Sequence, residues 1–116
     1  MALNTETIKH TNGDTQDIID VVLECYLANR TQVAELAQSL RGATDAITAT
    51  NVYEFVKNSI RYKEDPPGVQ WVKTPNRLLA DGVGDCKSFS ILQMSLLYCL
   101  GVDAMFRFAA YHNNPN

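Results

Sequence analysis

Signals for disulfide bonding, zinc binding and secretion are weak in this sequence of 116 residues. The three cysteines, Cys25, Cys86 and Cys99, are an odd number at wide and irregular spacings, which disfavours both a disulfide framework and a zinc site. Residues 1–7 lack the basic and apolar regions of a secretory signal peptide. Together these absences predict a protein of a reducing, cytoplasmic compartment.

Long apolar runs and an excess of basic residues are also missing. The most apolar segment, 89–100, is too short to span a membrane and is interrupted by Gln93 and Ser95. Lys and Arg number 10 against 13 Asp and Glu, a net charge of −3, so neither nucleic acid nor an anionic membrane is an expected partner. The acidic residues are scattered and form no dense carboxylate loop, and we expect no metal and no cofactor.

The motif Gly82-Val83-Gly84-Asp85-Cys86 predicts a tight turn into a helix. Asp85 is a good N-cap residue, which puts Cys86 at the first helical position. The helix dipole and the free N–H groups at such a position favour negative charge, so a cysteine there has a lowered pKa. Cys86 is therefore the candidate nucleophile, in preference to a buried cysteine that only fills space.

The helix behind Cys86 is predicted to lie at the centre of the domain. From Ile91 to Leu100 it is apolar on nearly all sides, and Gly101 is a suitable residue to end it. Cys25 and Cys99 also lie in apolar helical runs, and both are interpreted as core residues.

A family resemblance rests on the residues around Cys86. The motif Gly82-X-Gly84-Asp85-Cys86-X-X-X-Ser90, its leucine-rich helix, the exit Leu100-Gly101-Val102 and the segment Ala104-Met105-Phe106-Arg107-Phe108 resemble the core of the transglutaminase-like superfamily. The resemblance covers about residues 48–111. It implies a papain-like Cys-His-Asp site and amide chemistry on a peptide or protein substrate, either peptide hydrolysis or acyl transfer.

Two residues upstream of Cys86 are candidates for stabilising an oxyanion. Cysteine hydrolases need a second donor beside the N–H of the nucleophile itself. Gln70 and Trp71 lie in a predicted loop over 65–73. Papain-like enzymes use an upstream glutamine and animal transglutaminases a tryptophan, so the resemblance makes both residues candidates. The alternative is a solvent-facing Gln70 beside a Trp71 that serves packing.

The histidine that such a site needs does not match the family pattern. A thiolate that acts on amides requires an imidazole to take and return the proton. The sequence has only His10 and His112. His112 is the better candidate, but it is followed by Asn-Asn-Pro-Asn and reads more readily as a turn residue; His10 lies in a polar segment. No acidic third member can be named.

The order of predicted elements gives an α+β fold. Amphipathic helices are predicted from Asp14 or Thr15, from Val33 to Leu40, and from about Thr48–Asn51 to Ile60, and a short helix after Thr74-Pro75. The cysteine-bearing helix should then pack on a partial antiparallel sheet, as in the papain-like fold. Residues 1–13 are polar and predicted to be a flexible leader before a single domain over 14–116.

The end of the sequence raises two possibilities. Residues 102–111 are predicted to form the first strand of the sheet, and a hairpin begins at His112, which favours a domain truncated at its C-terminus. The unpaired edge of that strand would allow a homo-oligomer. The alternative to an enzyme is a non-catalytic helical interaction module or homodimer built on the same scaffold.

Overall fold

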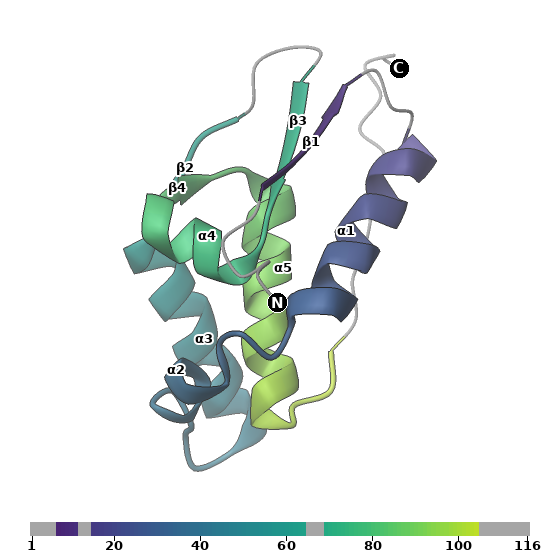
Figure 1. The fold of residues 1–116 in the computed structure, drawn as a ribbon. Helices are drawn as coiled ribbons and strands as arrows, with labels where there is room; N and C mark the ends of the chain where they lie inside the picture. Colours follow the sequence, from purple (N-terminus) through teal and green to yellow (C-terminus); the bar gives the residue numbers. More distant parts are fainter. Residues whose placement is uncertain (1–6, 12–14, 65–68, 105–116) are drawn as a thin grey trace, which may run out of the picture.

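The computed structural model describes residues 7–11, 15–64 and 69–104. A single helix, α5, passes through the centre of the fold, with α1 on one side and α2 and α3 on the other (Figure 1). The elements in chain order are β1 (Thr7–Thr11), α1 (Thr15–Asn29), α2 (Ala34–Gln38), α3 (Asp45–Ser59), β2 (Arg61–Tyr62), β3 (Val69–Lys73), α4 (Pro75–Asp81), β4 (Val83–Gly84) and α5 (Cys86–Leu100).

Polar side chains cap α3, α4 and α5, and the cap of α5 is described below with the candidate site. The hydroxyl of Thr44 accepts a hydrogen bond from the N–H of Ile47 at the start of α3, three to six residues before the predicted start. Thr74 accepts in the same way from Arg77, with Pro75 at the first position of α4. These caps satisfy N–H groups that have no partner within the helix, which fixes where each helix begins.

The core divides into two clusters on opposite sides of α5. One joins α5 to α2, α3 and α4 through Ala37, Val52, Val56, Leu78, Leu92 and Leu96, which are buried. The other joins α5 to α1 and β3 through Val22, Cys25, Tyr26, Val72 and Ile91. Because both sides of α5 are buried, the prediction of a central helix that is apolar on nearly all sides is confirmed.

Two small sheets lie beside the start of α5. β1 pairs with β3 in the antiparallel sense, and β2 pairs with β4 in the parallel sense. The prediction of a loop over 65–73 is therefore wrong for its last five residues, because Val69–Lys73 form β3. Within residues 1–13, predicted to be flexible, Thr7–Thr11 form β1. Each strand supplies the backbone partners of the other, so neither is evident from its own short segment.

The strand predicted over 102–111 falls mostly outside the described residues. Val102, Asp103 and Ala104 have no regular secondary structure, and the rest of that segment is not described. Gly101 ends α5 as predicted, at a φ of 74°, and the N–H of Val102 reaches back 3.0 Å to the carbonyl of Leu97. Within the described ranges, no helix is long and apolar enough to cross a membrane.

Candidate active site

Cys86 is the first residue of α5, and its side chain is exposed. The carboxylate of Asp85 caps the helix by accepting hydrogen bonds from the N–H groups of Lys87 at 3.1 Å and Ser88 at 3.4 Å. The ammonium group of Lys87 also forms an ion pair with Asp85. Asp85 is therefore occupied as a cap, and Cys86 stands at the solvent-facing start of a buried helix.

The backbone N–H of Cys86 is left available by this cap. Asp85 takes the next two N–H groups, and no acceptor among the described residues takes that of Cys86. A free N–H at the positive end of a helix dipole, beside an exposed thiol, is an arrangement that can stabilise an oxyanion formed when the thiol attacks a carbonyl.

The turn before Cys86 needs its two glycines for different reasons. Gly82 ends α4 at a φ of 69°, a left-handed conformation that side chains disfavour. Gly84 is buried, and a Cβ added there would lie 2.5 Å from Cδ1 of Leu78. Gly84 thus allows the backbone to pack against α4 just before Cys86.

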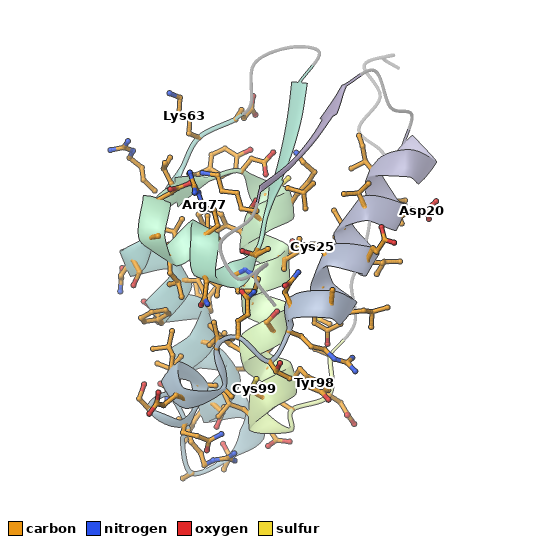
Figure 2. The ribbon with its side chains drawn as sticks, in the orientation of Figure 1. Asp20, Cys25, Lys63, Arg77, Tyr98 and Cys99 are labelled. Atoms are coloured by element: carbon orange, nitrogen blue, oxygen red, sulfur yellow. The ribbon has the colours of Figure 1, made fainter. Side chains whose placement is uncertain are left out.

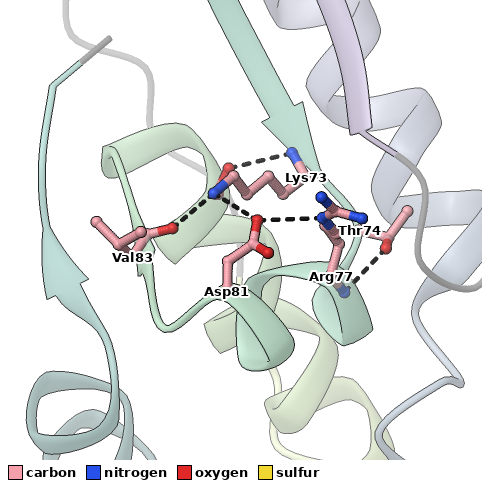
Figure 3. A network of polar contacts seen from close by, with 6 residues as sticks. Lys73, Thr74, Arg77, Asp81 and Val83 are labelled. Carbon is pink, nitrogen blue, oxygen red and sulfur yellow. Dashed lines mark hydrogen bonds and ion pairs between the residues drawn. The ribbon is translucent and has the colours of Figure 1, made fainter.

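A polar network holds β3 against α4 and the first turn of α5 (Figure 3). The Lys73 ammonium donates to the carbonyl of Val83 at 2.7 Å and pairs with Asp81 at 2.8 Å. The N–H of Lys73 donates to the hydroxyl of Ser88 at 3.1 Å. Arg77 also binds Asp81, at 3.1 Å. The end of β3 is thereby fixed beside the start of the cysteine-bearing helix.

The two oxyanion candidates belong to this strand. The structure describes the backbone of Gln70 and Trp71 on β3, while their side chains lie outside what it describes. The register of the sheet sets His10 of β1 opposite Gln70. His112 lies outside the described residues. The fold therefore brings the strand that carries Gln70 and Trp71 to α5, and it gives His10 a defined position on the neighbouring strand.

Cys25 and Cys99 have other environments than Cys86, as Figure 2 shows for the two labelled thiols. Cys25 is 2% exposed, and burial raises its pKa to about 11. Cys99 is half-buried; its thiol lies 3.3 Å from the carbonyl of Arg30, and burial raises its pKa as well. A raised pKa keeps a thiol protonated at neutral pH, so neither is suited to act as a nucleophile.

Comparison with known proteins decides the family. The model of the transglutaminase-like superfamily matches residues 34–116, which is most of the chain. The chain belongs to the transglutaminase-like superfamily. No curated protein and no solved structure gave a significant match. The matched part includes Cys86, and it begins after β1 and α1.

Membership of the superfamily agrees with the fold, which is mostly helical with small sheets and is of the α+β class. It extends the resemblance noted for residues 48–111 toward both ends of the sequence. Across the described ranges, no group of three or more His, Cys, Asp or Glu side chains could hold a metal ion.

Tyr62 was not among the residues predicted for the site, but the fold places it beside the turn that leads to Cys86. In β2 it stands opposite Gly84, two residues before Cys86, and its ring packs edge-on against Phe89 with centroids 5.9 Å apart. Its pKa is raised by partial desolvation and by the negative charges of Cys86, Glu64 and Asp85, in that order. The sequence holds one indirect signal for this surface. Phe89 and Gln93 follow Cys86 by three and seven residues, and this helical spacing puts them on the same face of α5 as Cys86.

Proposed function

We propose that this protein uses Cys86 as the nucleophile of a reaction on amides. It is either a cysteine-dependent amide hydrolase, in the simplest case a peptidase, or an acyl transferase. The observation that carries the proposal is an exposed thiol at the first position of the buried helix α5, beside a backbone N–H of Cys86 that no acceptor among the described residues takes. The superfamily match supports amide chemistry of this kind.

The reaction divides into two steps. The sulfur of Cys86 attacks the carbonyl carbon of an amide, and the oxyanion is stabilised by the N–H of Cys86 with Gln70 or Trp71 as second donor. The C–N bond then breaks, and the amine leaves with a proton delivered by the base. Water resolves the resulting thioester in hydrolysis, and a second amine resolves it in acyl transfer.

A histidine is the base that this chemistry requires. His112 keeps this role as a prediction from the sequence. His10 is the other imidazole of the chain, and its place opposite Gln70 in the β1–β3 register supports it as the alternative. An imidazole from a strand that precedes the nucleophile in the sequence would suffice, because a catalytic site is defined by geometry and not by the order of its residues.

The test is release of amine from a mixture of acetylated, amidated peptides, followed by mass spectrometry. We expect Cys86→Ser to reduce the rate by about a thousandfold or more, because the attacking thiolate is lost. Cys99→Ala is the matched control and should retain the wild-type rate. Equal activity of Cys86→Ser and wild type would exclude Cys86 as the nucleophile.

The same assay assigns the base. Loss of activity in His10→Ala with His112→Ala unaffected would assign the base to His10 on β1, and the opposite result would assign it to His112. A full rate in the double variant would show that neither histidine serves.

A further inference from the structure

A pocket of about 490 Å³ opens beside the start of α5. The end of α3, the short strand β2 and the first two turns of α5 form its walls, and aromatic rings dominate them: Tyr53, Tyr62 and Phe89. Ile60, which follows α3 and is buried, is the aliphatic part. Tyr53 and Tyr62 are 53% and 51% exposed. Large half-exposed aromatic surfaces around a hollow are typical of a ligand site.

The charged groups among the described lining residues of this pocket are both positive. Lys57 and Arg61 line it, and none of the other described lining residues is an Asp or a Glu. Neither cation forms an ion pair with a carboxylate of the described residues; the ammonium of Lys57 lies 5.8 Å from the centre of the Tyr53 ring. Glu64 does not line the pocket, and its carboxylate lies 3.5 Å from the Tyr62 hydroxyl. The whole chain is acidic, so two unpaired cations in one hollow favour an anionic ligand.

The pocket lies along the face of α5 that carries the candidate nucleophile. Phe89 and Gln93 line it, and both lie on the same face of α5 as Cys86. At about 1.5 Å of rise per residue, they stand about 4.5 and 10 Å along the helix axis from Cys86. An extended peptide advances about 3.3 Å per residue. A substrate bound at the thiol would therefore reach the pocket with a side chain within about three residues of the reacting amide.

We propose that this pocket is a specificity subsite that binds an acidic side chain, Asp or Glu, of a peptide substrate within three residues of the amide attacked by Cys86. The aliphatic part of that side chain packs on the rings of Tyr62 and Phe89, and its carboxylate pairs with Lys57 and Arg61. The amide of Gln93 is placed to donate a hydrogen bond to the bound peptide. The proposal rests on the function proposed above for the site itself.

The experiment measures binding in a variant that cannot turn over. ¹⁵N-labelled Cys86→Ala protein is titrated with acetylated, amidated hexapeptides that each carry one Glu. Paired peptides carry Gln in place of that Glu. We expect the Glu peptides to bind about fivefold more tightly or better, with the amide signals of Arg61, Phe89 and Gln93 shifting.

Substitution of the two cations provides the second readout. Lys57→Gln with Arg61→Gln should reduce the affinity for Glu peptides to that for Gln peptides and leave the latter unchanged. Lys63→Gln is the matched control, because Lys63 is exposed, lies two residues from Arg61 and does not line the pocket (Figure 2). Added salt should weaken binding of the Glu peptides selectively.

Three outcomes would overturn the proposal: equal affinity for Glu and Gln peptides, an unchanged preference in the Lys57→Gln, Arg61→Gln protein, or no binding of any peptide. Shifts of amide signals that are confined to residues away from the pocket would also count against the proposal. Such a pattern would arise if a second copy of the chain, or another segment of it, occupied the pocket. Binding to Cys86→Ala protein does not depend on catalysis. A preference for Glu peptides without amidase activity in the wild type would retain the subsite and reject the catalytic proposal.

Discussion

At the scale of single residues, the three cysteines carry the same thiol in three environments. Cys86 is exposed at a helix start, Cys99 is half-buried near α5's end, and Cys25 is enclosed between α1, β3 and α5. The Nδ2 of Asn29 and the carbonyl of Lys73 each lie 3.8 Å from the sulfur of Cys25. These differences decide which thiol can do chemistry and which contributes to stability.

Burial of Cys25 predicts a loss of stability at alkaline pH. Its pKa is about 11 in the folded protein, against 9.0 for an unperturbed thiol, because burial disfavours the thiolate. The protonated form is the one favoured by folding, so this contribution is complete below pH 9 and is lost as the pH rises toward 11. From pH 8 to 11 the free energy of unfolding of wild type should fall by roughly 2 kcal/mol more than that of Cys25→Ala.

Urea unfolding followed by circular dichroism gives this comparison, with Val22→Ala as the control, because Val22 belongs to the same buried cluster and carries no titratable group. The control should lose the same amount of stability at every pH. Parallel curves for Cys25→Ala and wild type would contradict the assignment of Cys25 as a buried, protonated thiol.

At the scale of elements, the end of β3 and the helices α4 and α5 form one joined unit through Lys73, Asp81 and Ser88. The pKa of Asp81 is lowered, first by the hydrogen bond from Lys73. A carboxyl group with a lowered pKa adds stability above the pKa of the unfolded chain and loses it as the pH falls through the folded value. Since the side chain of Asp81 is partly exposed, solvent screening keeps this contribution small.

Asp81→Asn should therefore reduce the free energy of unfolding by about 0.5–1 kcal/mol at pH 7 and by less at pH 2, because the contribution of the carboxylate is lost as the pH falls below the pKa of the unfolded chain. Chemical denaturation at the two pH values measures this difference. Asp103→Asn, at an exposed position, is the control and should have no effect at either pH. An equal loss for Asp81→Asn at both pH values would mean that packing, and not the ion pair, accounts for it.

The helices could be predicted from sequence because their signals are local. Asp85, Thr74 with Pro75, Gly82 and Gly101 mark helix ends through their own conformational preferences, and the structure places the ends of α4 and α5 at these residues. α3 begins at Asp45, three to six residues before the predicted start at Thr48–Asn51. Ile47, the first large apolar residue after the Thr44 cap, is 48% exposed, so it lies outside the buried face that gives the helix its periodic signal.

The strands could not be predicted in the same way. β1 and β3 are separated by more than fifty residues, and each has only five. The prolines before Val69 and the polar residues around Ile8 favour a loop and a leader when each segment is read alone. Their pairing is a long-range property, and it is this pairing that gives His10 its position opposite Gln70.

At the scale of the whole molecule, the fold gathers its chemistry at the start of α5. The cap and the central helix could be inferred from residues 82–101, and the resemblance to the transglutaminase-like superfamily from residues 82–108. The pocket could not, because Tyr53, Arg61 and Phe89 come from three elements that meet only in the folded chain. The place of the candidate nucleophile is thus encoded locally, and the surface beside it depends on the packing of α3 and β2 against α5.

If the fold activates Cys86, its thiol should be alkylated faster in the protein than in a short peptide. Native protein receives a short pulse of iodoacetamide at pH 7, and site-resolved mass spectrometry gives the rate at each thiol. A synthetic peptide of residues 82–90 supplies the reference for the same cysteine without the fold. We expect Cys86 in the protein to react at least about fivefold faster than the peptide, and far faster than Cys25. A rate at or below that of the peptide would contradict an activated nucleophile and would favour a non-catalytic interaction module on the same scaffold.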